Sequence, residues 1–152
     1  MISLYSENEK RKKPPSSVIK FEGIYFFGGM RQNGDLIQKL YILMIGQNPM
    51  KWMSPQAIID MNGPSPPGMI GHSMMYNPIL NILTVFGGRN DQYSPINSEC
   101  FFNSVWMLKL GTLQWVKLSA EGLPPSVRYG HASCAVDSKI FVFGGLNGRE
   151  YS

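Results

Sequence analysis

A double glycine that closes an apolar run recurs at nearly equal intervals along this 152-residue chain, and this recurrence limits the possible folds more than any other feature. The pairs are Gly28-Gly29, Gly87-Gly88 and Gly144-Gly145, and the first glycines of successive pairs are 59 and 57 residues apart. Self-similarity at a regular period of tens of residues is typical of chains built from structural repeats. The sequence therefore predicts three related units.

Other signals return in the same order between the glycine pairs. An aromatic and aliphatic run comes first, and a tryptophan, a Pro-Pro pair and a Gly-His pair follow it. The members are Lys39–Ile45 and Ser104–Leu110, Trp52 and Trp115, Pro66-Pro67 and Pro124-Pro125, and Gly71-His72 and Gly130-His131. This pattern resembles the kelch repeat, whose hallmarks are a double glycine, a downstream aromatic strand and a tryptophan. The resemblance covers the chain from about Val18 onward and implies four-stranded antiparallel blades of a β-propeller.

The expected fold class is thus all-β, a partial kelch-type β-propeller with one complete blade and two incomplete ones. The 16 glycines and 11 prolines, scattered between apolar runs, also favour many short strands joined by tight turns. We divide the chain into a basic polar tail (1–17), an incomplete first blade (18–55), a complete second blade (56–123) and the first half of a third blade (124–152).

The repeat also predicts where the strands lie. The expected strands are, in chain order, Ile24–Phe27, Lys39–Ile45, Lys51–Ser54, His72–Tyr76, Ile82–Phe86, Ser104–Leu110, Leu113–Leu118, His131–Val136 and Ile140–Phe143. The first copy lacks the Gly-His signal, because only 13 residues separate Pro15 from Gly28, against 20 and 19 in the equivalent segments. Its innermost strand is therefore expected to be shortened, with Val18 to Phe21 as the remnant.

The length of the chain conflicts with a closed propeller. Closed propellers have four to eight blades, whereas 152 residues at about 57 per unit supply roughly 2.7 blades. An open arc would leave strand edges and aromatic faces without neighbours. We predict that the missing blades come from the rest of a longer chain or from another subunit, and that the isolated chain is not a stable, cooperatively folding monomer.

The net charge of +4 is concentrated near the N-terminus. Residues 1–20 hold five basic and two acidic side chains, so the repeats themselves are almost neutral. The Lys10 to Lys13 run is expected to be a solvated tail, with contact to a phosphate, a membrane surface or an acidic partner as the alternative. A nucleic-acid partner is therefore not expected.

The chain shows no apolar stretch of 18 or more residues and no secretory signal, so no membrane association is expected. A cytoplasmic location, free or cytoskeleton-associated, is the resulting prediction. Its two cysteines, Cys100 and Cys134, lack CxxC spacing and favour neither a disulfide framework nor a zinc site. We expect Cys134 to be buried in a strand and Cys100 to be a free thiol in a loop.

No catalytic machinery is visible, and the chain is expected not to be an enzyme and to hold no cofactor or metal. A nucleophile with an adjacent base and the G-x-G-x-x-G fingerprint are both missing from the sequence. His72 and His131 occupy the same repeat position, which favours a structural hydrogen bond over metal ligation. The residues assigned structural roles are His72, His131, Trp52, Trp115, Gly28, Gly29, Gly87, Gly88, Gly144 and Gly145.

All the long connections are predicted on one face of the sheets. In a four-stranded antiparallel blade the second-to-third strand link, Arg89 to Asn103, and the link between blades, Pro55 to Ile70, leave from the same side. Extra loop length on one side of a rigid scaffold is typical of a binding surface. The candidate partner-binding residues there are Arg31, Gln32, Asn33, Arg89, Asn90, Asp91, Tyr93, Asn147 and Arg149.

Guanidinium and amide groups suit carboxylates and peptide backbones, and the alternative is that these are ordinary solvated turn residues. Arg128 is expected to serve the blade itself. The predicted function is a non-enzymatic scaffold for protein-protein interaction that uses this loop face. Two alternatives stay open: a structural subunit of a cytoskeletal or ciliary assembly, and a regulatory propeller attached to an enzyme, such as a phosphatase or a ubiquitin-ligase adaptor.

Overall fold

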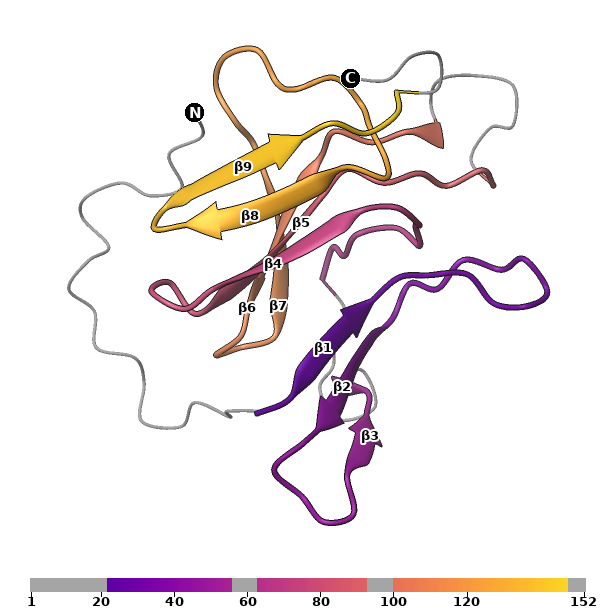
Figure 1. The fold of residues 1–152 in the computed structure, drawn as a ribbon, viewed down its shortest axis with the longest axis vertical. Helices are drawn as coiled ribbons and strands as arrows, with labels where there is room; N and C mark the ends of the chain where they lie inside the picture. Colours follow the sequence, from indigo (N-terminus) through magenta and orange to yellow (C-terminus); the bar gives the residue numbers. More distant parts are fainter. Residues whose placement is uncertain (1–21, 56–62, 93–99, 148–152) are drawn as a thin grey trace.

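The computed structural model describes residues 22–55, 63–92 and 100–147, which form three separate antiparallel sheets (Figure 1). All the secondary-structure elements in these ranges are β-strands, and the predicted all-β class is confirmed. The first sheet has three strands, the second four and the third two. The strands are β1 (Ile24–Phe27), β2 (Leu40–Met44), β3 (Lys51–Met53), β4 (Ser73–Asn77), β5 (Ile82–Phe86), β6 (Val105–Lys109), β7 (Gln114–Leu118), β8 (Ala132–Val136) and β9 (Lys139–Phe143).

Each predicted strand is present, and its ends differ from the prediction by at most one residue. The difference at β7 has a clear cause, since Leu113 has a φ of 54° and belongs to the turn before the strand. The predicted remnant of a first strand, Val18 to Phe21, lies outside the described residues.

Every strand pairs with the strand that precedes or follows it in sequence, so each sheet is a simple meander. Short turns join β4 to β5, β6 to β7 and β8 to β9 at one end of the sheets. The described ends of the longer connections lie at the opposite end, beside the glycine pairs (Figure 1). Asn81 and Asp137 take the left-handed backbone conformation in two of the short turns, which their side chains tolerate well.

The core consists of two apolar layers, one on each side of the second sheet. Leu83 and Val85 of β5 face the first sheet and pack in a cluster with Phe27, while Phe86 faces the third sheet and packs with Ile140. Because successive side chains of a strand point to opposite faces, both faces of β5 are covered and all five of its residues are buried, four of them apolar and one, Thr84, polar. The three sheets therefore stack in a row, with the second in the middle.

The outer sheets are covered on one side only. In β9, Ile140 and Val142 are half-buried against the second sheet, whereas Phe141 and Phe143 are exposed. On the opposite end of the row, Phe26 of β1 is exposed. Both ends of the row thus present apolar side chains to solvent.

The prediction for Cys134 is wrong in one respect, and that for Cys100 agrees with the structure. Cys134 lies on a strand as expected, but it is exposed, because its side chain points to the uncovered side of β8. Cys100 lies in a loop as expected, but it is buried, and its carbonyl accepts a hydrogen bond from the backbone N–H of Asn90 at 2.7 Å. Both are free thiols.

Candidate functional site

The Gly-His and double-glycine signals meet where one sheet packs on the next. A Cβ added at Gly28 would lie 2.6 Å from Cε1 of His72, and one at Gly87 would lie 2.7 Å from Cε1 of His131. Real Cβ atoms do not approach other atoms so closely, and both glycines also have φ near 70°. Each imidazole therefore occupies the space that the absent glycine side chain leaves in the preceding sheet.

The two junctions between the sheets share further contacts. The N–H of Gly29 donates to the carbonyl of Met69 at 2.9 Å, and the N–H of Gly88 donates to the carbonyl of Arg128 at 2.8 Å. The phenylalanine before each glycine pair meets the same imidazole edge-on, with ring centroids 5.8 Å apart at the first junction and 5.2 Å apart at the second. The repeat in the sequence is thus a repeat of inter-sheet contacts.

The second junction has three more hydrogen bonds. Nε2 of His131 lies 2.8 Å from the hydroxyl of Ser73. The N–H of Gly130 donates to the carbonyl of Gly71 at 2.7 Å, and the side-chain amide of Asn77 donates to the carbonyl of Asp137. These bonds join residues in or just before β4 to residues just before and just after β8. His131 thus bonds across the junction to β4 of the preceding sheet.

Burial is the main cause that lowers the pKa of both imidazoles. For His72, a hydrogen bond with the backbone of Phe27 opposes this shift in part, and nearby His131 adds to it. For His131, the positive charge of Arg128 lowers the pKa further. Both rings are therefore neutral at neutral pH, which suits packing against glycine. Within residues 22–55, 63–92 and 100–147, no three His, Cys, Asp or Glu side chains converge as metal ligands would.

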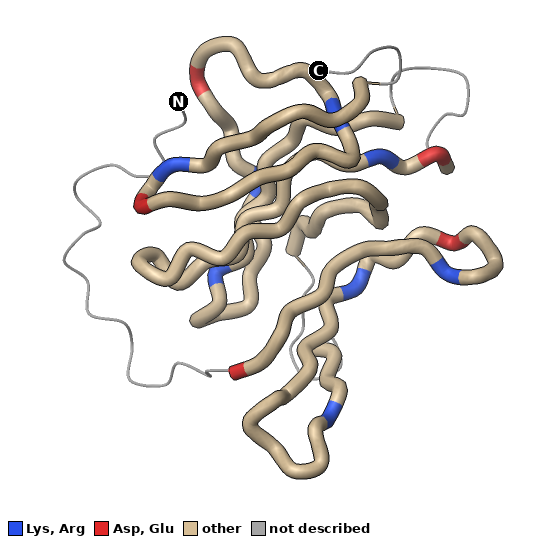
Figure 2. Tube along the Cα trace, in the orientation of Figure 1, with Lys and Arg blue, Asp and Glu red and all other residues tan. Residues whose placement is uncertain are grey.

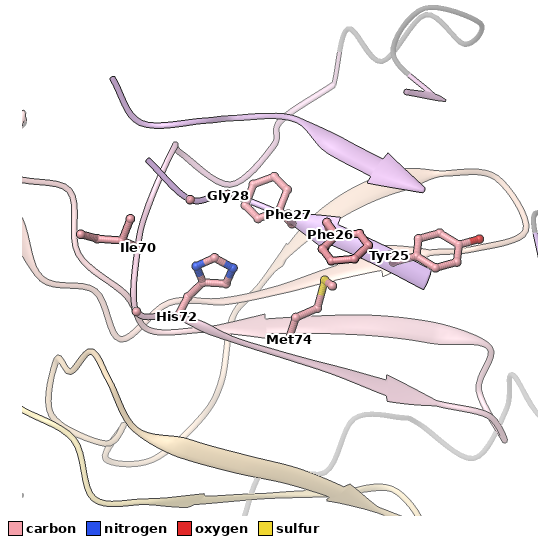
Figure 3. Close-up of a pocket in the computed structure, with 9 residues that line it drawn as sticks. Tyr25, Phe26, Phe27, Gly28, Ile70, His72 and Met74 are labelled. Carbon is pink, nitrogen blue, oxygen red and sulfur yellow. The ribbon is translucent and has the colours of Figure 1, made fainter. Parts of the chain in front are cut away.

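A hollow of about 340 Å³ lies beside the first junction (Figure 3). It is lined by β1, by Gly28 and Gly29, and by the segment from Ile70 to Met74. Its titratable lining groups are the neutral imidazole of His72 and the phenol of Tyr25, whose pKa is raised by burial and by the charge of Tyr76. Such a lining suits apolar contacts better than proton transfer.

The long-loop face is defined here by the described residues that connect the strands at this end: 28–39 between β1 and β2, 54–55 and 63–72 between β3 and β4, 87–92 and 100–104 between β5 and β6, 119–131 between β7 and β8, and 144–147 after β9. Figure 2 shows acidic and basic residues interspersed along the trace of the described residues. The sign of the charge therefore does not distinguish one part of this face from another.

The loop with Arg31, Gln32 and Asn33 is exposed and held by its own hydrogen bonds. The N–H of Arg31 donates to the carbonyl of Asp35 at 2.8 Å, and the amide of Asn33 donates to the carboxylate of Asp35 at 2.8 Å. Asn33 thus stabilises the turn. Arg31 and Gln32 extend from it into solvent.

Arg89 is constrained through both its backbone and its side chain. Its backbone pairs with Ile70 through two hydrogen bonds of 2.9 and 3.0 Å. Its guanidinium lies 4.6 Å from the centroid of the Tyr129 ring, and that ring stacks on Phe101 at 5.3 Å. A loose ion pair of 3.5 Å joins it to Asp91, and its side chain stays 32% exposed. We call Arg89, Tyr129, Phe101 and Asp91 the Arg89 stack.

The repeat brings different residues to equivalent places in the three loops. Arg89 is the first residue after its glycine pair, and the equivalent residues are Met30 and Leu146, as their bridges show. Arg31 corresponds instead to Asn90, which is only 4% exposed. The amide of Asn90 donates to the carbonyl of Gly68 at 2.6 Å. Asn90 therefore holds the loop in place and is not offered to a partner.

The remaining candidates divide into two groups. Asn147 is half-buried in the described structure, and Tyr93 and Arg149 lie outside the described residues. Arg128 donates to the carbonyl of Gly144 at 2.9 Å and to Ser126 through two further bonds, so it links the β7–β8 connection to the third glycine pair. The Arg89 stack was not predicted as a unit, although Phe101 and Tyr129 were visible as aromatic residues close to the glycine and Gly-His signals.

The contacts between the sheets repeat together with the double glycine and the Gly-His pair of the sequence. A comparison with protein families identifies the same kind of repeat. Residues 16–152 match the model of the KLHDC2/KLHL20/DRC7 Kelch-repeats domain. The chain belongs to the kelch-repeat family.

Several individual proteins resemble it. Tip elongation aberrant protein 1 of Schizosaccharomyces pombe is 31% identical over 122 residues, which cover 80% of this chain and 10% of that protein. The Rab9 effector protein with kelch motifs of Bos taurus is 28% identical over 128 residues, covering 84% and 31%. Human Kelch domain-containing protein 3 is 27% identical over 134 residues, covering 88% and 32%. The chain thus spans at most about a third of the length of these relatives.

None of the described segments forms a helix that is long and apolar enough to cross a membrane.

Proposed function

We propose that this chain is a non-enzymatic protein-binding module that holds a partner on its long-loop face. Membership of the kelch-repeat family supports a role in protein interaction. One relative is named as an effector of Rab9, a name that implies a protein partner for that relative. The observation that carries the proposal for this chain is the Arg89 stack.

The stack offers a charged group that is already held in place. Its arginine pairs through its backbone with Ile70, forms a further bridge with Phe101, and rests its guanidinium on the Tyr129 ring. A side chain fixed before binding loses little conformational entropy when a partner arrives. Aromatic residues and arginine are also the residues that contribute most often to binding energy in protein interfaces.

The chemistry of the stack favours a partner that presents a carboxylate next to an apolar group. The ion pair with Asp91 is loose, so a better placed carboxylate can form shorter, charge-assisted bonds with the guanidinium. Phe101 and Tyr129 supply half-buried aromatic surface beside it. Because charges of both signs are interspersed along the chain, a polyanion is a poor partner for this face.

A peptide-display selection against the folded chain, followed by affinity measurement of the selected peptides, tests the proposal. Arg89→Ala is expected to weaken binding by about tenfold or more, which corresponds to about 1.4 kcal/mol. Lys139→Ala is the matched control, because Lys139 is an exposed basic residue at the start of β9, beside the short turn at the opposite end of the sheets. Selected peptides that bind both variants as tightly as the original chain would refute the proposal.

Two further predictions accompany the proposal, one on the location of the protein and one on the source of additional blades. A cytoplasmic location follows from the sequence alone and stays a prediction. Whether additional blades are supplied by the rest of a longer chain or by another subunit is a separate question, and the end faces of the row of sheets bear on it.

A further inference from the structure

The row of three sheets ends in two uncovered faces. The leading face is the side of β8 and β9 that points away from the second sheet, and it exposes Phe141, Phe143 and Cys134. The trailing face is the side of β1 to β3 that points away from the second sheet, and it exposes Ile24, Phe26 and Trp52. Apolar groups of this size on a single face mark a surface that another protein surface covers.

The leading face repeats one half of a junction that the chain already forms twice. Phe143 precedes its glycine pair as Phe27 and Phe86 precede theirs. Phe27 and Phe86 each meet the next sheet and are 7% and 2% exposed, whereas Phe143 is 84% exposed. What Phe143 lacks among the described residues is a following sheet.

The trailing face repeats the other half of that junction. Trp115 of β7 packs on Phe27 of the preceding sheet, with ring centroids 5.2 Å apart, and is 6% exposed. Trp52 holds the equivalent place in the first sheet, yet it is 62% exposed and its ring contact among the described aromatic residues is with Phe26 of its own sheet at 5.2 Å. Within residues 22–55, 63–92 and 100–147, no phenylalanine of a preceding sheet covers Trp52.

We propose that two copies of this chain associate head to tail, with the leading face of each covering the trailing face of the other. Phe143 of one copy then packs near Trp52 of its partner, as Phe27 packs near Trp115 within the chain. Two copies of three sheets give six, which falls within the range of about four to eight sheets in closed propellers. Head-to-tail contacts that close a ring leave no uncovered face, unlike a chain of copies that does not close.

The ring has a consequence for partner binding. Head-to-tail association keeps the strands of both copies running in the same sense about the ring axis. The two long-loop faces therefore lie on the same side of the ring, and the two Arg89 stacks can engage one divalent partner. This consequence rests on the proposed function above, whereas the association itself does not.

Measurement of the solution mass by light scattering, over a concentration series, tests the association. The original chain is expected at twice 17.1 kDa. Phe143→Asp and Trp52→Asp are each expected to give the single mass, and Ile79→Asp, at an exposed turn position away from both faces, is expected to leave the double mass unchanged. A monomeric original chain would contradict the proposal, and it would leave the other blades to the rest of a longer chain. Species that grow steadily with concentration would contradict the closed ring.

An equimolar mixture of the two variants separates this proposal from a symmetric face-to-face dimer. The Phe143→Asp chain keeps an intact trailing face, and the Trp52→Asp chain keeps an intact leading face. One intact junction can therefore form in the mixture, and dimers are expected there although neither variant dimerises alone. A mixture that stays monomeric would overturn the head-to-tail arrangement.

Thiol labelling gives a second readout and also monitors folding. Cys134 lies on the leading face, so its alkylation is expected to slow as dimers form and to stay fast in Phe143→Asp. Cys100 is buried in the second sheet's loop and is expected to stay unreactive in every folded variant. Rapid labelling of Cys134 in a chain of double mass would show that dimers form by another face and would refute the proposal.

Discussion

Trp52 and Trp115 carry the same signal in the sequence and stand in opposite surroundings. Trp115 of the second sheet is buried against Phe27, whereas Trp52 of the first sheet is largely exposed. Phe86 and Phe143 differ in the same way at the other end of the row. The comparison shows that the repeat fixes which way a side chain points. The presence of a neighbouring sheet then decides whether that side chain is buried.

The strands of the second and third sheets show the same contrast along their length. All five residues of β5 are buried, while those of β9 alternate between exposed and half-buried. Each strand contains four apolar residues and one polar residue, Thr84 in ILTVF and Lys139 in KIFVF. Apolar composition alone therefore does not predict burial in a protein of this kind, and the comparison of equivalent positions can be tested by substitution.

The largest difference is expected between Trp115→Ala and Trp52→Ala. Removing a buried aromatic ring leaves a cavity and costs about 3–5 kcal/mol of the free energy of unfolding. Both substitutions are made in the Phe143→Asp chain, in which the proposed association between copies is not expected to form. There, removing the exposed ring loses its contact with Phe26 and should cost under about 1 kcal/mol. Urea denaturation followed by circular dichroism measures both. Equal losses would show that the two tryptophans do not differ in the way the structure describes.

A smaller difference is expected between Gly88→Ala and Gly29→Ala. Both glycines are second in their pair, with φ of 96° and 97°, so both substitutions carry a similar backbone penalty of about 1–2 kcal/mol. A Cβ at Gly88 would also lie 2.9 Å from Cβ of His72, while one at Gly29 meets no atom within 4 Å. Overpacking should add about 1–3 kcal/mol at Gly88. The same urea titration applies, and a Gly29→Ala chain as unstable as Gly88→Ala would break the comparison.

Acid is expected to weaken the junctions between the sheets. The pKa of His72 and that of His131 are lowered by burial in the folded chain, relative to about 6.5 in the unfolded chain. The unfolded state then binds more protons, so the stability that the neutral rings contribute is present above about pH 6.5 and is lost as the pH falls towards the folded values. The free energy of unfolding should therefore decrease over this window.

The control for the acid effect is the His72→Gln chain measured over the same pH range. Its stability should decrease less steeply below about pH 6.5 than that of the original chain, because one of the two shifted groups is gone. His72 is the more informative of the two histidines, because its imidazole is more deeply buried than that of His131. Parallel pH profiles would exclude His72 as a source of the acid sensitivity.

The smallest difference is expected between the two loop arginines. Arg89→Ala removes a cation-π contact with Tyr129 and should cost about 0.5–1 kcal/mol of stability. Arg31→Ala removes an exposed side chain and should change stability by less than about 0.5 kcal/mol. Differential scanning calorimetry of the two variants against the original chain resolves this contrast. A larger loss for Arg31→Ala would reverse the ranking of the two loops.

The strand pattern could be predicted from the sequence because it depends on local signals. Glycine pairs, short polar turns and apolar runs are properties of neighbouring residues, and all nine expected strands are found within one residue at each end. The family assignment rested on the same signals and is confirmed by the match over residues 16–152.

The burial of individual side chains could not be predicted in the same way. Cys134 was expected to be buried but is exposed, whereas the loop residue Cys100 is buried. The difference arises because burial depends on whether another segment of the chain covers the residue. The sequence alone places Asn90 among the exposed loop residues. In the structure its side-chain amide donates a hydrogen bond to the carbonyl of Gly68, which is distant in the sequence. The Arg89 stack likewise joins residues that are 40 positions apart in the sequence, Arg89 and Tyr129, and no local pattern reveals such a contact.

The repeated junction is the central claim, and the two imidazoles report on it directly. A nuclear Overhauser experiment on histidine-labelled chain measures whether the Hε1 proton of each imidazole lies close to the Hα protons of a glycine. We predict two matching cross-peaks, from His72 to Gly28 and from His131 to Gly87. Loss of both, with the chain still folded, would contradict the account.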